Sequence, residues 1–419
     1  MEAVPTERSR RLGRRHRAGA GSTRARQLRS GAWLSALLLL ALAPLAVGTA
    51  AADEYDRARR IHDRIAGVPP SDSVLERMAD RIRDENPEGA AELAMQDPAF
   101  VNSTLKTFVT PWTNEEQTVF APLNDYSATV MGIIRDRRSF KEVLTGDVIY
   151  VGVDQSPGYS RDDNLHYEAL EVSGDDLSLM SVMAPRFQDD LNGSLMRNEA
   201  AGVITTRAAG KAFFRAGTNR RMFRFLTINY LCRDMEALTD NTRSPDRIRQ
   251  DVSRSPGGDS EIFLNTCAGC HAGMDPMTGA FAYFEWQPDD EDPERGRVNY
   301  TRGVVQPKYL INANTFPFGY ATADDRWDNY WRTGANSVLG WRSAETGGYG
   351  PRSLGEQIAE SDAFSRCQVE KVFEQVCFRP PSDRTDREEV EAVRQDFEDN
   401  GYDLMDVFAD VAAYCSEGL

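Results

Sequence analysis

The sequence predicts a mainly α-helical fold with minor β structure and long loops. Apolar residues recur at the helical spacing over most of the chain, and several helix ends carry capping residues. Of the 419 residues, 41% are apolar and 27% are charged, values that are typical of a globular protein. Collagen-like, coiled-coil and fully disordered structures are therefore excluded.

The N-terminal half of the chain contains several predicted helices and both predicted strands. Helices are expected over 53–66, 71–85, 87–96 and 124–136, with Ser71 as an N-cap and prolines at the breaks between them. The run 147–153 is the best strand candidate, and 201–206 is a weaker one.

The C-terminal half is expected to be loop-rich in its middle and helical at its end. A short helix is predicted over 261–266, after a turn. Residues 285–350 are rich in Asp, Pro, Gly and aromatic side chains, whereas a capping box at 385–388 and an apolar pattern from Leu404 onward predict two helices. The changes in composition and predicted structure along the chain divide it into five segments. They are a leader (1–52), an N-terminal helical region (53–145), a mixed α/β middle region (146–255), a segment with aromatic-rich loops (256–350) and a C-terminal helical domain (351–419).

The first 52 residues have the three parts of a secretory signal peptide. A basic start that ends at Arg29 leads into an apolar run over 32–48, and the small residues 50–52 precede Asp53. The apolar run is shorter than the ~20 residues of a membrane-spanning helix, which disfavours an uncleaved anchor. We expect cleavage after Ala52, export to the periplasm or the extracellular space, and no integral membrane segment in the mature chain.

Charge is unevenly distributed along the chain. Residues 1–52 contain nine arginines and two acidic residues, a surplus of +7, so the total of −16 leaves −23 on the other 367 residues. A surface of that sign repels phosphates and excludes a nucleic-acid-binding body. It favours partners with a basic docking face.

Residues 267–271 read Cys-Ala-Gly-Cys-His, the CxxCH pattern of c-type haem attachment. Two thiols at this spacing can each bond to one vinyl group of the same porphyrin, and the adjacent His271 then reaches the iron as proximal ligand. A redox CxxC pair does not need the histidine, and a zinc site needs further ligands nearby. The sequence therefore predicts one covalently attached haem c on Cys267, Cys270 and His271. The fold expected around it is a cytochrome c-like helical haem domain embedded in a larger helical protein.

The motif continues into Met274-Asp275-Pro276-Met277 and then Gly279-Ala280-Phe281-Ala282. This run resembles the CxxCH-xx-(M/I)DP haem segment of planctomycete-type mono-haem c cytochromes, which are exported proteins. In that family a helix precedes the segment and a C-terminal helical domain of unknown function follows it, and here 218–232 and 353–408 resemble these two parts. The acidic run 289–292 replaces the aromatic-Asp and Gly-x-x-Arg pattern that is common there. The resemblance covers about the last half of the chain and implies a haem protein.

The other four cysteines are Cys232, Cys367, Cys377 and Cys415, an even number in a chain expected in an oxidising compartment. Cys367 and Cys377 are ten residues apart in one predicted helix, a rise of about 15 Å, so they cannot pair with each other. We expect one of them to pair with Cys415 and the other with Cys232. Free buried thiols are the alternative.

The usual source of a second iron ligand is missing. A small cytochrome c supplies a methionine from downstream of its CxxCH, but no Met or His lies between Met277 and Met405. Met222 opens a predicted helix, shares one face with Phe225, Leu226 and Asn229, and is either the distal ligand or a core methionine. The remaining methionine candidates are Met180, Met183, Met196, Met235 and Met405.

Histidines add one further candidate for the distal position. His166 lies among carboxylates and is either that ligand or a surface or hydrogen-bonded residue. His62 lies on a charged helix face and is expected to be exposed to solvent. If neither Met222 nor His166 binds, the iron is five-coordinate or water-bound and open to peroxide or oxygen chemistry.

The aromatic residues of 285–350 have three uses that the sequence leaves open. They can cover the haem edge, shelter another ligand or fill the core. Eight of them are of interest here: Trp286, Tyr309, Phe316, Phe318, Tyr320, Trp327, Tyr330 and Trp331.

The sequence as a whole predicts an exported mono-haem c-type cytochrome that transfers single electrons to or from a redox partner with a basic docking face. Two alternatives stay open: a haem enzyme with an open iron site, and a haem-containing binding module for a partner or carbohydrate. The absence of a recognisable catalytic motif favours electron transfer. The length of the chain favours a function beyond that of a bare electron carrier.

Overall fold

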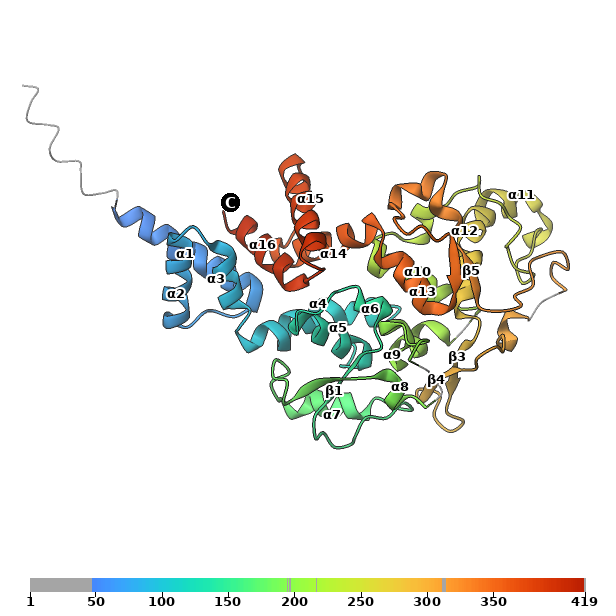
Figure 1. Cartoon of the computed structure of the whole chain (residues 1–419), viewed down its shortest axis with the longest axis horizontal. Coiled ribbons are helices and arrows are strands. Elements are labelled where there is room, and N and C mark those ends of the chain that lie inside the picture. The colour runs from blue at the N-terminus through green and yellow to red at the C-terminus, as the bar shows by residue number, and fades with distance from the viewer. Residues whose placement is uncertain (1–46, 194, 196, 216, 311–313, 418–419) are drawn as a thin grey trace, which may run out of the picture. The chain divides into compact units, whose positions relative to one another are not determined.

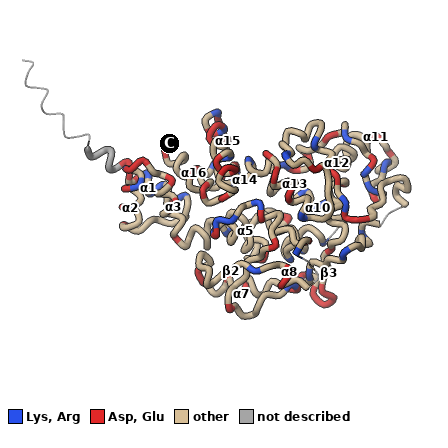
Figure 2. The backbone as a smooth tube through the Cα atoms, viewed as in Figure 1, with Lys and Arg blue, Asp and Glu red and all other residues tan. Residues whose placement is uncertain are grey.

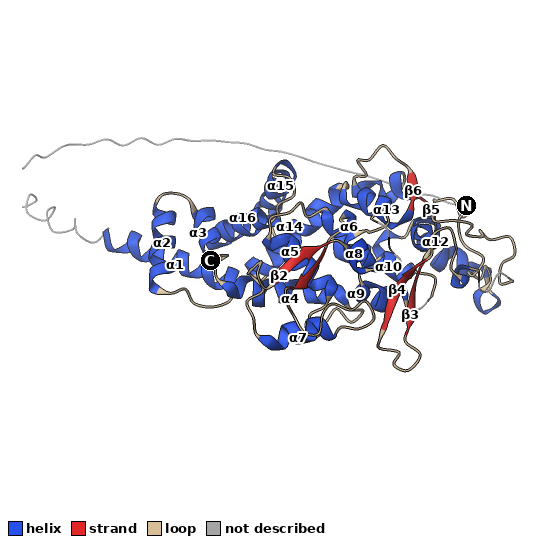
Figure 3. Ribbon diagram, turned by 60° about the horizontal axis from the view of Figure 1, so that its bottom comes forward, coloured by secondary structure: helices blue, strands red, loops and turns tan. Residues whose placement is uncertain are grey.

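Helices carry most of the chain, and the strands form three separate antiparallel pairs (Figure 1; Figure 3). The computed structural model describes residues 47–417 except 194, 196, 216 and 311–313. Helix accounts for 55% of the structure and strand for 8%, which confirms the mainly helical class. The α-helices are α1 (Val47–Ala66), α2 (Asp72–Arg83), α3 (Pro87–Ala94), α4 (Lys106–Val109), α5 (Asp125–Arg135), α6 (Glu142–Thr145), α7 (Leu165–Ser173), α8 (Gln188–Leu191), α9 (Arg207–Ala209), α10 (Arg220–Leu231), α11 (Ser260–Ile262), α12 (Ala268–Thr278), α13 (Gly350–Ala359), α14 (Asp362–Cys377), α15 (Arg384–Asp399) and α16 (Leu404–Ser416). The strands are β1 (Ile149–Gly152), β2 (Met183–Arg186), β3 (Phe284–Pro288), β4 (Gly296–Tyr300), β5 (Arg326–Asp328) and β6 (Gly347–Tyr349).

Side-chain caps start the helices that the sequence predicts. The Ser71 hydroxyl accepts from the Val74 amide at the start of α2, and Asn86 caps α3 with Pro87 in its first turn. Asn124 and Ser127 form a capping box at α5. Each cap satisfies an amide that would otherwise lack a partner, so these boundaries follow from local sequence.

The N-terminal helices contact the C-terminal helices, although they lie at opposite ends of the sequence. Arg57 Nε of α1 donates to the Ser416 hydroxyl at 2.7 Å, and Arg60 donates to the Ser416 carbonyl at 3.1 Å. Arg64 reaches the Val376 carbonyl of α14 at 3.4 Å. Figure 1 shows α3 beside α16 in the same region.

His62 is buried, and the prediction of an exposed histidine is wrong. Only 1% of His62 is accessible, and its Nδ1 lies 2.8 Å from the Val68 carbonyl oxygen. Ile61 and Ile65 on the same helix are fully buried. The charged neighbours of His62 in the sequence lie on the other sides of α1. Their charge therefore does not indicate that the face carrying His62 is exposed.

Helix α5 lies at the centre of the fold. Every residue of α5 from Asp125 to Ile134 is buried, and the helix contacts β1 closely, because a Cβ on Gly132 would lie 2.2 Å from the ring of Tyr150. β1 pairs antiparallel with β2, with Tyr150 opposite Pro185. The predicted strand at 147–153 is therefore confirmed as β1.

The weaker strand prediction, at 201–206, is wrong. Residues Gly202–Thr205 form a turn of 3₁₀-helix, and Gly202 has a φ of +52°. Its amide donates to the Gly146 carbonyl, and a Cβ there would lie 2.2 Å from the Val143 carbonyl oxygen. Close approach of two backbones at a left-handed residue requires glycine and prevents an extended strand.

The loop-rich segment contains two strand pairs and part of the core. β3 pairs with β4, and β5 pairs with β6, both antiparallel. Of the eight aromatic residues named above for this segment, Trp286, Tyr309, Trp327 and Trp331 are buried in the main core, so core packing is confirmed for these four. The acidic residues 289–292 form the exposed loop after β3 (Figure 2).

Two disulfides confirm the predicted cysteine pairing. Cys232 bonds to Cys367 and Cys377 bonds to Cys415. The first bond joins the end of α10 to α14, and the second joins α14 to α16. Helix α14 is therefore held at two points ten residues apart.

Residues 51–419 form one compact unit, so the predicted segment boundaries from 145 onward lie inside it. The predicted leader lies outside the described residues up to position 46, and its last six residues begin α1. Within the described part of the chain, no helix has both the length and the apolar character needed to cross a membrane.

Removal of the Cys377–Cys415 bond is expected to destabilise the fold. In the double variant Cys377→Ala/Cys415→Ala, a loop of 38 residues is no longer closed in the unfolded state, which corresponds to a loss of about 4 kcal/mol. Urea unfolding measures this loss. Val338→Ala, a truncation at a side chain that is 84% exposed, is the control, and equal stability of the double variant and the wild type would contradict the assignment.

Asp410 is expected to make the protein less stable as the pH rises. Burial, together with the carboxylates of Asp406, Glu88, Asp396 and Glu389, raises the pKa of Asp410 to about 7 from an ordinary 3.8. The folded state therefore holds a proton that the unfolded state releases, and stability falls between these two pKa values. Asp410→Asn is expected to raise the free energy of unfolding at pH 8 by on the order of 1 kcal/mol after solvent screening, with a gain that shrinks towards pH 5. Thermal unfolding at both pH values tests this, with the exposed Asp399→Asn as control; a gain independent of pH would disprove it.

Candidate haem-attachment site

The CxxCH residues lie on one continuous helical stretch. The Asp259 side chain caps α11, a turn of π-helix over Phe263–Cys267 follows, and α12 begins at Ala268. The predicted short helix at 261–266 is therefore the start of a longer one, and it delivers Cys267 at the end of its π-turn. A helix fixes both thiols and the imidazole relative to one another, which two-point attachment of one macrocycle requires.

Cys267 and Cys270 are the free cysteines of the chain. Both are half-buried, with Cys267 beside a small cluster formed by Ile248, Phe263 and Ala272. The Sγ of Cys270 lies 3.3 Å from the Thr239 hydroxyl. Four cysteines are thus consumed in disulfides, and the two that stay free are those of the CxxCH motif.

His271 contacts a buried carboxylate on the next turn of α12. Its Nδ1 lies 3.1 Å from Oδ1 of Asp275, whose side chain is inaccessible to solvent, while 21% of the His271 side chain is exposed. An ionised carboxylate only accepts, so Nδ1 carries the proton and donates it. The Nε2 atom has no hydrogen-bond partner among the described residues and is left available to a metal.

Two arginines surround Asp275. Arg220 of α10 donates through Nε to Oδ1 at 2.7 Å and through Nη2 to Oδ2 at 3.0 Å, and the amide of Arg249 donates to Oδ2 at 3.1 Å. Burial by itself would raise the pKa of Asp275, but the charges of Arg220 and Arg249 and the His271 hydrogen bond hold it well below its usual range. The carboxylate is therefore ionised, and its position is fixed from three segments of the chain.

Arg220 is shared between Asp275 and a second aspartate. Its Nη1 donates to Oδ2 of Asp251 at 2.8 Å, and its Nη2 donates to Oδ1 at 2.8 Å. These partners raise the pKa of Arg220 despite the cost of burial. Asp251 thus belongs to the same charged cluster without touching His271.

Apolar side chains are exposed beside the motif. Ile262 is 44% and Leu264 57% exposed, on the turns just before Cys267. Phe318, 92% exposed, contacts Phe316 in a separate loop. This loop lies next to the motif helix, because the guanidinium of Arg254 lies over the rings of both Phe316 and Phe263. An apolar macrocycle bound to this helix would find apolar contacts here.

The residues present therefore fit a covalently held haem on its proximal side. The chain supplies two free thiols at the required spacing, an imidazole with a protonated Nδ1 and a free Nε2, and exposed apolar groups next to them. Cys267 and Cys270 would hold the macrocycle, and His271 would bind its iron.

Met222 is placed on a different face of α10 from the residues that reach α12. Arg220 contacts Asp275, and Phe223 lies 5.5 Å, ring to ring, from Trp331. Met222 is about 200° around the helix from Arg220 and is buried in the main core.

His166 uses both of its ring nitrogens in the protein. Its Nε2 accepts from the Gly152 amide at 2.9 Å, so its Nδ1 is protonated and donates to the Pro157 carbonyl at 2.9 Å. Only 2% of His166 is exposed. In this conformation no nitrogen of His166 is free to bind iron. Its hydrogen bond to the Gly152 amide joins α7 to β1.

The remaining methionines do not gather at the motif. Met180 is exposed, Met183 and Met405 lie in or against the main core, and Met196 is outside the described residues. Met235 is adjacent to the motif through its backbone, because its carbonyl lies 3.5 Å from Cys270 Sγ.

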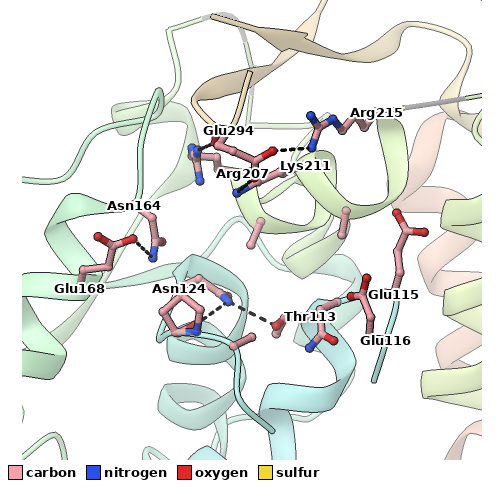
Figure 4. A pocket seen from close by; sticks show the side chains of 15 residues that line it. Thr113, Glu115, Glu116, Asn124, Asn164, Glu168, Arg207, Lys211, Arg215 and Glu294 are labelled. Carbon is pink, nitrogen blue, oxygen red and sulfur yellow. Dashed lines mark hydrogen bonds and ion pairs between the residues drawn. The ribbon is translucent and has the colours of Figure 1, made fainter. Parts of the chain in front are cut away.

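A polar cavity of about 330 Å³ lies elsewhere in the molecule (Figure 4). Lys211 and Arg215 both pair with Glu294 at 3.0 Å on one wall, and Glu115 and Glu116 lie on the other. None of the predicted site residues lines this cavity. The cationic groups of Lys211 and Arg215 are both paired with Glu294, and no residue of the CxxCH helix lines the cavity.

No protein-family model, curated protein or solved structure matches this chain.

Asp275, Arg220 and Arg249 are the site residues that the sequence analysis did not single out. Asp275 could have been found, since it stands four residues after His271 in a helix and so faces it. Arg220 and Arg249 are 55 and 26 residues from Asp275 in the sequence, and no local pattern connects them.

Gly273 is expected to be required where Trp331 meets α12. A Cβ there would lie 1.9 Å from Nε1 of the fully buried Trp331, so Gly273→Ala forces that ring away. Overpacking of this kind costs about 1–3 kcal/mol, which urea unfolding followed by tryptophan fluorescence measures. Gly158→Ala, at an exposed position with no neighbour within 4 Å, is the control, and equal effects at both positions would refute this role.

Proposed function

We propose that the protein is an exported mono-haem c-type cytochrome that transfers single electrons. The observation that carries this proposal is the division of its cysteines: four form disulfides, while the CxxCH pair stays free beside an imidazole with an available Nε2. A haem bound here supplies a one-electron redox couple. Cys267 and Cys270 attach it, and His271 binds the iron.

Export is supported by the two disulfides and by the leader-like first 52 residues. Disulfides persist in oxidising compartments, which are also where haem c is attached to exported chains. The charge of −23 on residues 53–419 favours a redox partner with a basic docking face.

A second candidate, a haem enzyme with an open iron position, is favoured by the placement of the two distal candidates. Met222 is buried in the main core, and His166 would have to give up two hydrogen bonds. An iron without a protein ligand on its distal side is accessible to peroxide or oxygen.

Covalent attachment is the first test. Expressed with a c-type haem maturation system, the full chain is expected to keep haem absorbance after denaturation and to stain for haem on a denaturing gel. Cys267→Ala/Cys270→Ala abolishes this signal, because both thioethers are lost. Cys377→Ala/Cys415→Ala keeps it, since that pair is structural. A wild-type chain without covalent haem overturns the proposal.

The absorption spectrum of the purified holoprotein then separates the two candidates. A low-spin ferric spectrum with the weak charge-transfer band of a methionine sulfur bound to iron supports electron transfer. Loss of this band in Met222→Ala would identify Met222 as the ligand. A high-spin ferric spectrum that changes readily on addition of cyanide supports the open site.

A further inference from the structure

We infer that Asp275 is a positioning residue that fixes the ring of His271 and lowers the reduction potential of the haem bound there. This inference rests on the proposed function, because it concerns the ligand side of the same site. It assigns to the chain a determinant of potential that the CxxCH motif does not contain.

The first step is geometric. Oδ1 of Asp275 lies 3.1 Å from Nδ1 of His271, one helical turn away, and so fixes the orientation of the ring and leaves Nε2 without a hydrogen-bond partner among the described residues. A metal-binding histidine is commonly oriented through its second nitrogen, by a carboxylate, a backbone carbonyl or water. Here the acceptor is a carboxylate, which brings a full negative charge to the ring.

The second step is that this carboxylate cannot turn away. Arg220 engages both of its oxygens, and the Arg249 amide engages Oδ2. The Asp275 side chain has no solvent exposure, so its hydrogen bond to His271 does not compete with water.

The third step is the effect on the iron. A hydrogen bond from Nδ1 to a carboxylate makes the imidazole a stronger donor. The ferric state carries one more positive charge than the ferrous state, so a stronger donor and a nearby negative charge both favour it. Asp275 therefore stabilises the ferric state relative to the ferrous state, and the midpoint potential of the haem is lowered.

Asp275→Asn tests this in the holoprotein, because asparagine keeps the shape and an acceptor oxygen but removes the charge. The ratio of oxidised to reduced haem at a fixed ambient potential is expected to fall at least tenfold, equivalent to a midpoint about 59 mV higher. Spectroelectrochemical titration measures it. Asp251→Asn is the matched control: it removes a buried charge from the same Arg220 cluster without touching His271, and its shift is expected to be much smaller.

Arg220→Gln provides a second variant, which serves if Asp275→Asn does not fold. Loss of Arg220 leaves the Asp275 charge less neutralised, so the midpoint potential is expected to fall. Where Asp275→Asn does fold, the effect should be largely lost in the double variant, because Arg220 acts through Asp275.

The inference is overturned if Asp275→Asn shifts the potential no more than Asp251→Asn does, or if Arg220→Gln leaves it unchanged or raises it. A wild-type chain that takes up no haem overturns the proposed function instead. A loaded wild type with unaltered variant potentials overturns only the role of Asp275.

Discussion

The ion-paired carboxylate of Asp275 is the constraint around which the CxxCH region is organised. A fully buried charge is costly unless it is paired and hydrogen-bonded, and Asp275 receives donors from Arg220, Arg249 and His271. These partners come from α10, from the segment before α11 and from α12 itself. One side chain therefore joins three segments that are distant in sequence and sets the direction of the imidazole. Loss of the carboxylate would leave Asp251 as the acidic partner of both Arg220 and Arg249, which is why shape-preserving substitutions are informative here.

The second organising feature is the pair of disulfides that hold α14. Its two disulfides join it to α10 on one side and to α16 on the other. Because α10 also carries Arg220, the helix that completes the Asp275 cluster is tied covalently to the C-terminal helices. The N-terminal helix α1 contacts the same C-terminal helices through Arg57 and Arg60. The structural cysteines thus stabilise the scaffold that holds the site without taking part in it.

Local sequence was sufficient for features whose cause is local. The predicted cap at Ser71 starts its helix, since its hydroxyl satisfies a backbone amide three residues on. The capping box predicted at 385–388 is formed instead by Asp383 and Asp386. The helical rise between Cys367 and Cys377 forbids a bond between them, which leaves two possible pairings of the four cysteines, and the structure decides between these two. The strand at 201–206 and the exposure of His62 were mispredicted for the opposite reason. Gly202 turns where the backbone of Val143 approaches it, and the buried ring of His62 is hydrogen-bonded to the carbonyl of Val68, which lies beyond the end of α1.

The sequence by itself determined that the chain is mainly helical, that it carries one CxxCH motif, and that its other four cysteines can pair in only a few ways. Spacing along one helix is enough for those conclusions, because bond lengths and helical rise limit which groups can meet. Only the tertiary structure decided that Met222 faces the core, that both nitrogens of His166 are occupied, and that Arg220 and Arg249 converge on Asp275. These outcomes depend on how α10, α7 and α12 pack against the rest of the chain. Packing is a property of residues far apart in sequence, and no local pattern encodes it.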